Sequence, residues 1–223
     1  MKLVLFDCDG TLVDSVGLIH EVMTRTFRHF GHRLPEIAET KAIIGLTLDI
    51  AIARMQGKFE VDAEATAMMA YYKTIFVDVR SEPGFQEPLF DGIAEVVATM
   101  ALQDDLLIGA VTGKSRRGLD HILETHGLTH HFIVSRTADE CPSKPNPAMV
   151  YECCDETGMS PRNTIVIGDA IYDMQMGKAA GATAIGVSWG YASRPELVRA
   201  GADVIVDHPF DLLAHVMKEK VDA

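Results

Sequence analysis

Residues 3–15 read LVLFDCDGTLVDS, in which a continuous apolar run ends at two aspartates separated by a single residue. An uninterrupted apolar run of this length is typical of a β-strand covered on both faces. Because residues two apart on a strand point the same way, Asp7 and Asp9 are expected to face one pocket and Cys8 the opposite side. Buried carboxylates cost free energy unless a partner compensates them, so the pair suggests a site. The alternative interpretation is a solvated turn, since aspartate and glycine are common turn residues.

The second half of the chain alternates short apolar runs with helical patterns. Besides the strand at 3–6, we expect strands at 106–111, 132–134, 164–168, 183–187 and 204–206. A last helix follows the final strand, and the other helices are expected near 89–103, 115–126, 147–157 and 172–180. Strands that alternate with helices predict right-handed crossover units and a mostly parallel sheet. About six strands are too few for an eight-stranded barrel, so we predict an α/β fold with a Rossmann-like open parallel sheet.

Between residues 16 and 80 the pattern is helical only. The spacing of apolar residues favours helices at 16–31, from Pro35 to about 45, at 48–56 and at 61–79. Pro83 and Gly84 then interrupt the chain before the alternating pattern begins. We therefore expect two domains: a catalytic core of residues 1–14 and 84–223, and an all-helical cap domain inserted at 15–83.

Other predicted strands also end in side chains that can carry chemistry. Thr112 follows the second strand and Asp169 follows the fourth. Asp173 lies four residues further on, on the same face of a helix that starts there. Lys144 lies in the loop SKPNP after the third strand. Ligands of open parallel sheets bind beyond the carboxyl ends of the strands, and a solvated turn does not predict this gathering, so we interpret it as a functional site.

Carboxylates gathered at one sheet edge have the chemistry of a magnesium site. Asp7, Asp9 and Asp169 offer hard oxygen ligands, which suit Mg²⁺ rather than zinc. With a phosphoryl group bound there, Asp7 could attack phosphorus, and Asp9 could exchange protons with the leaving oxygen and with water. Thr112 could donate a hydrogen bond to a phosphoryl oxygen, and Lys144 could offset the negative charge.

Four motifs in the order DCDGTLVDS, VTGKS, SKPNP and GDAIYD resemble those of the haloacid-dehalogenase-like phosphohydrolases. The resemblance covers essentially the whole chain, including a helical cap inserted after the first motif. It implies that Asp7 is the nucleophile and that Asp9 is the acid/base group. It also implies that Thr112 and Lys144 stabilise the phosphoryl group. It also implies a supporting residue, Asp173, and a magnesium ion held by Asp7, Asp169 and the backbone carbonyl of Asp9.

Single residues separate the branches of that family. Asp9 favours phosphate-ester chemistry, because the dehalogenase branch lacks this aspartate. Gly168 stands where the sugar-phosphate mutase branch usually has an acidic residue, and SWGYAS at 188–193 resembles a turn of phosphoglycolate phosphatases. The resemblance therefore favours a phosphatase similar to phosphoglycolate phosphatase, with a mutase as the alternative. Gly113 is a departure, because many relatives have asparagine there; the contact is either missing or supplied by Lys114.

Composition bounds the partners and the location. A formal net charge of −12 repels nucleic acid and anionic membranes, so we expect a small phosphorylated metabolite as the partner. The four cysteines show no CxxC spacing, which is typical of reduced thiols in a cytoplasmic protein. No apolar run approaches the length of a membrane span. The sequence does not predict the oligomeric state.

Two alternatives stay open from the sequence. The segment IIGLTL, residues 43–48, is either a loop that meets the substrate or a helix–helix turn, with neither favoured. A non-catalytic binding or regulatory protein on the same fold is the alternative to an enzyme, although a binder has no need of Asp9. If the cap moves, the linkers near 15–17 and 82–84 are its expected hinges.

Overall fold

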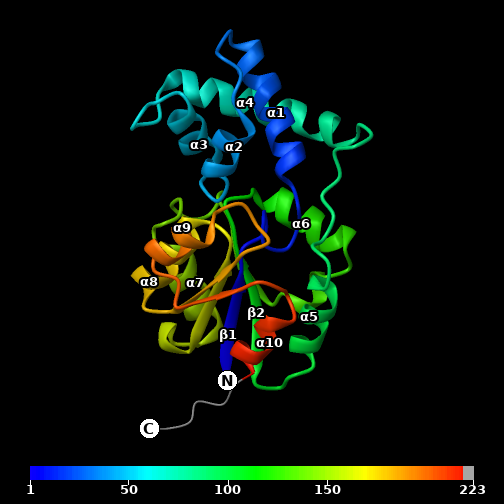
Figure 1. The fold of residues 1–223 in the computed structure, drawn as a ribbon, viewed down its shortest axis with the longest axis vertical. Coiled ribbons are helices and arrows are strands. Elements are labelled where there is room, and N and C mark those ends of the chain that lie inside the picture. Colours follow the sequence, from blue (N-terminus) through cyan, green and yellow to red (C-terminus); the bar gives the residue numbers. More distant parts are fainter. Residues whose placement is uncertain (218–223) are drawn as a thin grey trace.

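The sheet of the computed structural model, which describes residues 1–217, is six-stranded and parallel (Figure 1). Its strands are β1 (Lys2–Phe6), β2 (Leu106–Val111), β3 (Val134–Arg136), β4 (Thr164–Gly168), β5 (Thr183–Val187) and β6 (Val204–Val206). They lie in the order β3-β2-β1-β4-β5-β6, so the direction of winding reverses beside β1. The predicted α/β fold with an open parallel sheet is confirmed. Such a reversal is the place where open sheets bind their ligands.

Helices connect and follow the strands much as predicted. They are α5 (Ile93–Ala101), α6 (Arg116–Thr125), α7 (Ala148–Thr157), α8 (Ile171–Ala180), α9 (Arg194–Arg199) and α10 (Asp211–Val216). The sequence prediction omitted α9, because its 6 residues are too few to show a helical apolar period.

Two predicted boundaries were wrong. α5 begins after Gly92, not near 89, because Leu89 pairs with Val13 in an isolated antiparallel bridge and Gly92 then turns the chain at a positive φ. β3 begins at Val134 rather than two residues earlier, because its pairing with β2 starts there. Its pairing continues into polar residues at the sheet edge, where apolar spacing gives no signal.

Alternate residues of β1 pack on opposite faces of the sheet. Leu3 and Leu5 belong to a buried apolar cluster that includes residues of α7 and α8. Val4 and Phe6 belong to a second cluster with residues of α5, α6 and α10. Cys8 is buried in this second cluster, which confirms that it packs away from a site formed by its neighbours. The strand is anchored on both faces and therefore fixes the side chains that follow it.

Four helices lie between β1 and α5, and we call them the helical block: α1 (Val16–His29), α2 (Ile37–Ile43), α3 (Leu48–Met55) and α4 (Ala63–Arg80). The block has its own buried apolar cluster, in which Met23 of α1 and Met68 of α4 take part. Figure 1 shows it above the carboxyl ends of the strands. The four predicted helices are confirmed, except that α2 begins at Ile37 with Glu36 as its N-cap, so Pro35 precedes the helix.

The assignment of 1–14 with 84–223 to a core domain and of 15–83 to a cap domain stays a prediction. The helical block coincides with the predicted cap in sequence, and its separate apolar cluster agrees with a unit of its own. The last part of the predicted core segment, residues 218–223, lies outside the described residues.

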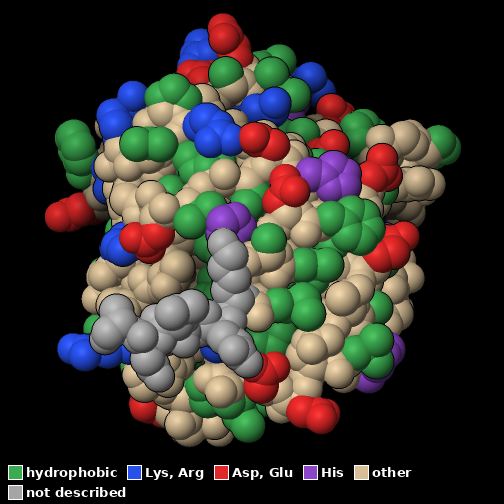
Figure 2. Space-filling view, turned by 60° about the horizontal axis from the view of Figure 1, so that its bottom comes forward, with side chains coloured by type: hydrophobic (Ala, Val, Ile, Leu, Met, Phe, Trp, Pro, Cys, Tyr) green, Lys and Arg blue, Asp and Glu red, His purple; other side chains and the backbone are tan. Residues whose placement is uncertain are grey.

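Charged side chains lie on the surface at one end of the sheet and are buried at the other. On the face remote from the helical block, acidic, basic and apolar side chains are interspersed (Figure 2). By contrast, buried charged residues occur at the carboxyl ends of the strands, among them Asp7, Lys144 and Asp169. Within residues 1–217, no helix combines the length and the apolar character that crossing a membrane requires.

Candidate active site

Aspartates from two strand ends and one helix meet at the edge of the sheet. Asp7 follows β1, Asp169 follows β4, and Asp173 lies in the first turn of α8; all are buried. One carboxylate oxygen of each lies within 4.8 Å of the others. The parallel pairing of β1 with β4 sets Phe6 beside Ile167, so the residues that follow these two leave the sheet close together. These aspartates, which we call the acidic cluster, are thus brought together as the sequence indicated.

Lys144 lies inside the acidic cluster. Its Nζ is 2.8 Å from Asp7 Oδ1 and 2.5 Å from Asp173 Oδ1, and its side chain is fully buried. Burial alone would lower the pKa of Lys144, but the charges of Asp173 and Asp7 raise it above its ordinary value. Asp173 Oδ2 also accepts a hydrogen bond from the Ala170 N–H at the start of α8. Asp173 therefore caps the helix and positions the lysine at the same time.

Asp7 stands out because neither oxygen of its buried carboxylate accepts a well-aligned hydrogen bond within the described part of the chain. The ammonium of Lys144 pairs with Oδ1 at 2.8 Å and partly offsets the buried charge. Burial and the charge of Asp173 raise the pKa of Asp7 to about 7, although Lys144 opposes them. Burial likewise raises the pKa of Asp169 well above its ordinary value. A divalent cation would satisfy such a group, and a donor set made only of oxygen fits Mg²⁺.

Asp169 is held in place on both of its carboxylate oxygens. Thr11 Oγ1 donates to Oδ1 at 3.0 Å, and the Tyr191 N–H donates to Oδ2 at 2.8 Å. Two glycines make room for this side chain. A Cβ at Gly10 would lie 2.3 Å from Asp169 Oδ2, and one at Gly190 would lie 2.2 Å from Asp169 Cβ. The first motif and the SWGYAS turn therefore close around the same carboxylate.

Asp9 lies outside the acidic cluster, and its carboxylate is held by one oxygen only. Oδ1 accepts hydrogen bonds from Ser15 Oγ at 2.5 Å and from Lys114 Nζ at 2.6 Å. Lys114 also pairs with Glu87 at 2.9 Å. Burial would lower the pKa of Lys114, but the charges of Asp9 and Glu87 raise it well above its ordinary value. No hydrogen bond from residues 1–217 reaches Asp9 Oδ2, so this oxygen is left for a ligand.

Thr112 and Gly113 occupy the end of β2. Thr112 is buried, and its Oγ1 accepts a hydrogen bond from the Lys114 N–H at 3.2 Å. A Cβ at Gly113 would lie only 2.6 Å from the carbonyl oxygen of Leu46. The loop at 43–48 therefore rests directly on Gly113, and an asparagine side chain would not fit beneath it. Lys114 contacts Thr112 within this motif, and its replacement of a contact that Gly113 lacks stays a prediction.

Sequence reasoning missed the role of two residues at the site. Glu87, in the linker that follows the helical block, carries no local motif and reaches Lys114 only through the fold. The second residue is Tyr191, for which the motif SWGYAS predicts no separate role. Its hydroxyl accepts hydrogen bonds from the N–H groups of Ser15 and Val16, each at 3.0 Å, at the start of α1. An aromatic turn after a buried strand was the one signal that could have pointed to Tyr191.

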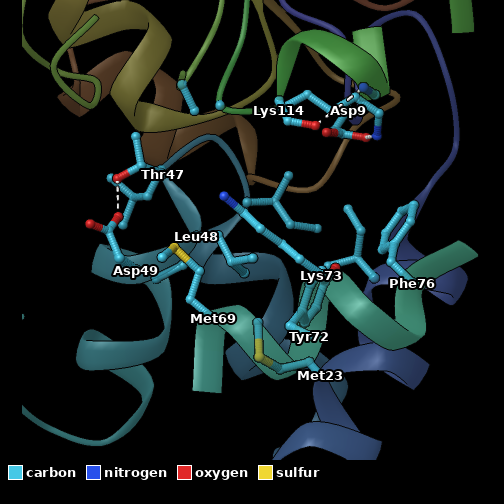
Figure 3. A pocket seen from close by; sticks show the side chains of 18 of the residues that line it. Asp9, Met23, Thr47, Leu48, Asp49, Met69, Tyr72, Lys73, Phe76 and Lys114 are labelled. Carbon is cyan, nitrogen blue, oxygen red and sulfur yellow. Dashed lines mark hydrogen bonds and ion pairs between the residues drawn. The ribbon is translucent and has the colours of Figure 1, made fainter. Parts of the chain in front are cut away.

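A cavity of about 460 Å³ lies between the helical block and the sheet edge. Figure 3 shows Asp9 and Lys114 on one side of it, and side chains of the block, among them Met23, Met69 and Tyr72, on the other. Every residue of the loop at 43–48 lines the cavity. The segment is therefore the turn between α2 and α3 and also lines the cavity, and its contact with a substrate stays a prediction.

The strand order reverses beside a buried acidic cluster that holds a lysine, and Asp9, two residues from Asp7, lines the cavity. The class of protein follows from comparison with known families. Residues 4–187 match the family described as haloacid dehalogenase-like hydrolase, and the chain belongs to this family. It is a phosphatase within that family and resembles phosphoglycolate phosphatase, as the motifs predicted.

Two curated relatives and one solved structure illustrate the similarity. The chain is 29% identical over 214 residues to the N-acetylmuramic acid 6-phosphate phosphatase of Pseudomonas putida, covering 95% of this chain and 94% of the relative. It is 28% identical over 222 residues to the phosphoglycolate phosphatase of Photobacterium profundum, covering 98% and 96%. The crystal structure of a hydrolase from Pseudomonas syringae superposes with a TM-score of 0.85 at 23% identity, covering 97% and 98%, and confirms the fold.

Proposed function

We propose that the protein hydrolyses a small phosphomonoester in two steps, with a phosphoryl group carried by Asp7 between them. The observation that carries the proposal is the contrast between the two aspartates of the first motif. Asp7 is buried, unsatisfied and 2.8 Å from the ammonium of Lys144. Asp9 is held through Oδ1 by Ser15 and Lys114, and it lines the cavity. One group is thus suited to attack and the other to exchange protons.

The chemistry follows from these positions. In the first step a carboxylate oxygen of Asp7 attacks phosphorus, the bond to the ester oxygen breaks, and Asp9 gives its proton to the leaving oxygen. In the second step water attacks phosphorus, Asp9 takes a proton from it, and the bond to Asp7 breaks, which releases phosphate. Thr112 donates a hydrogen bond to a phosphoryl oxygen, and Lys144 stabilises the charge that builds up on the phosphoryl group. Ser15 and Lys114 hold Asp9 in position.

The acidic cluster supports a magnesium requirement. Asp7, Asp169 and the backbone carbonyl of Asp9 would hold the ion, with Asp173 supporting the site through Lys144. When bound, Mg²⁺ would neutralise phosphoryl oxygens and keep the carboxylates ionised. The unsatisfied oxygens of Asp7 support this part of the proposal.

Gly168 favours hydrolysis over the mutase alternative. A Cβ at this position would lie 2.3 Å from the carboxyl carbon of Asp173. An acidic side chain at 168 would therefore displace Asp173, which positions Lys144. We propose 2-phosphoglycolate as the first compound to test, and a cytoplasmic location, which the buried and unpaired cysteines of the chain support.

Substitution of Asp7 tests the proposal. In Asp7→Asn the amide keeps the shape but cannot act as the nucleophile, so phosphate release from 4-nitrophenyl phosphate should fall on the order of a thousandfold or more. Asp91→Asn changes an exposed residue just before α5; this control variant should keep its activity. Activity should also disappear with a chelator and return with Mg²⁺. If Asp7→Asn matches the wild type, the nucleophile is another group; if no phosphoester is hydrolysed at all, the non-catalytic alternative returns.

A further inference from the structure

The cavity that Asp9 and Lys114 line is larger than a phosphate group needs, and its far wall belongs to the helical block. Its volume of about 460 Å³ falls in the range of sites that enclose whole small molecules. Met23, Met69 and Phe76 contribute apolar surface to this wall (Figure 3). The cavity can therefore hold a carbon skeleton in addition to the phosphoryl group.

The acidic residues along the cavity are already bound to protein donors. Asp49 Oδ1 accepts hydrogen bonds from Thr47 Oγ1 at 2.7 Å and from the Ile50 N–H at 2.8 Å. Asp139 Oδ2 accepts one from the Arg116 N–H at 2.8 Å. Each of these two carboxylates is thus held through one oxygen by protein donors, and neither forms an ion pair within the described residues.

The cationic side chains along the cavity differ in whether they already have a partner in the protein. Lys114 is occupied by Asp9 and Glu87, and the guanidinium of Arg80 lies over the Phe76 ring at 6.0 Å. Lys73 of α4 and Arg117 of α6, by contrast, are exposed and make no hydrogen bond or ion pair with any residue of the described chain. Figure 3 shows the side chain of Lys73 extending from α4 into the cavity, opposite Asp9 and Lys114, and we therefore take Lys73 first. In a chain of net charge −12, this ammonium is available to an anion inside the cavity.

We propose that Lys73 binds a carboxylate of the substrate while the phosphoryl group lies at Asp7, which rests on the proposed phosphatase function. The substrate class is then a phosphomonoester of a carboxylic acid, and the apolar wall favours an acid with a larger carbon skeleton than glycolate. The side chain of Lys73 is exposed in the structure, and the bound substrate would cover part of it and pair the two charges at the cavity. Lys73 is thus the residue that distinguishes acidic from neutral phosphomonoesters.

Two pairs of compounds that differ by the carboxylate test this assignment. They are 2-phosphoglycolate with 2-hydroxyethyl phosphate, and N-acetylmuramic acid 6-phosphate with N-acetylglucosamine 6-phosphate. We expect the wild type to prefer the acid of at least one pair, with the larger pair showing the stronger preference. Lys73→Met should lower kcat/KM for the preferred acid roughly tenfold or more and leave its neutral partner and 4-nitrophenyl phosphate within about twofold. Lys73→Arg, which keeps the charge, should retain much of the preference.

Matched variants separate the site from general effects of charge. Lys58→Met removes a lysine of the same block that pairs with Asp62 and Glu64, and it should keep the preference. Arg117→Met removes another cation that lines the cavity, from α6. The assignment is overturned if Lys73→Met keeps the preference, if Arg117→Met abolishes it instead, or if the wild type prefers neither acid. Failure of the phosphatase proposal is a different result, because 4-nitrophenyl phosphate would then not be hydrolysed by the wild type.

Discussion

The two aspartates of the first motif lie one residue apart but in opposite surroundings. Asp7 is enclosed with other carboxylates and a buried lysine, whereas Asp9 faces the cavity and is held by Ser15 and Lys114. Their spacing on the strand predicted a shared pocket, but of the two only Asp9 lines the cavity, whereas Asp7 is buried in the acidic cluster. Two acidic groups kept in different environments can take two different roles in one reaction.

The raised pKa of Asp7 predicts that Mg²⁺ binding depends on pH. Burial and the charge of Asp173 raise the pKa from 3.8 to about 7, so without metal the proton is retained as the pH rises toward neutrality. The retained proton stabilises the metal-free fold at low pH, and this contribution is lost as the pH rises through about 7. Mg²⁺ must displace the proton, so its affinity should rise with pH.

Calorimetric titration with Mg²⁺ in buffers of different ionisation enthalpy checks this expectation through the number of protons released. The increase in Tm caused by Mg²⁺ should also be larger at about pH 8 than at about pH 6. An affinity that does not change across this range, with no proton release, would contradict the pKa of Asp7 and the place of the metal.

At the scale of single residues, the sequence identified the groups that follow strand ends. Asp7, Asp169 and Thr112 could be found because a parallel sheet brings the ends of its strands to one edge. Glu87 could not be found, because its contact with Lys114 joins positions 27 residues apart through a linker without regular structure. Side-chain partners of this kind depend on tertiary packing, which no local pattern records.

At the scale of elements, the loop at 43–48 and the end of β2 are fitted to each other. The carbonyl oxygen of Leu46 lies where a side chain at 113 would start, and the Thr47 N–H donates a hydrogen bond to Ser143 Oγ at 2.9 Å. The loop therefore touches two of the catalytic motifs from the opposite side of the cavity. The backbone of the loop at 43–48 leaves no room for a side chain at position 113, which explains why this chain has glycine there.

Gly113→Asn tests the fit between these elements. The Cβ would lie 2.6 Å from the Leu46 carbonyl oxygen, so the loop must move away, and kcat/KM for the preferred substrate should fall roughly tenfold or more. Tm should also fall, because Ile43 and Ile44 of the displaced loop belong to the apolar cluster of the helical block. Gly158→Asn, at a glycine with φ +68° and open space around it, is the matched control. An active Gly113→Asn variant would show that the loop does not approach the site during turnover.

The type of most elements could be predicted from apolar spacing, whereas several boundaries could not. The continuous runs of β1, β2 and β4 are unambiguous because both faces of these strands are covered. β3 is at the sheet edge and half polar, and α5 starts late because Leu89 pairs with Val13. Such boundaries are set by partners elsewhere in the chain, so the local sequence does not fix them.

At the scale of the whole molecule, two chain segments join the helical block to the sheet core. Near the first, Tyr191 accepts hydrogen bonds from the N–H groups of Ser15 and Val16. At the second, Glu82 accepts two hydrogen bonds from the guanidinium of Arg25, at 2.6 and 2.7 Å, which ties the segment to α1. The cavity lies between the helical block and the sheet core, so we expect the two to separate when substrate enters and phosphate leaves.

A reversible crosslink tests this motion. In a Thr47→Cys, Ser143→Cys double variant, a disulfide would join the loop to the core where Ser143 already contacts the backbone of Thr47. Oxidation should slow turnover about tenfold or more, and a reductant should restore it. The single variants serve as controls, and the four native cysteines are all buried. Equal rates before and after oxidation would mean that the bodies need not separate.

The central claim is that Asp7 carries the phosphoryl group between the two steps. Rapid quenching of the enzyme during turnover in Mg²⁺, followed by peptide mass spectrometry, measures this directly. We predict a phosphoryl group on the peptide that contains Asp7, labile to hydroxylamine as an acyl phosphate is, and absent from Asp7→Asn. A phosphoryl group on another residue, or full turnover by Asp7→Asn, would contradict the mechanism.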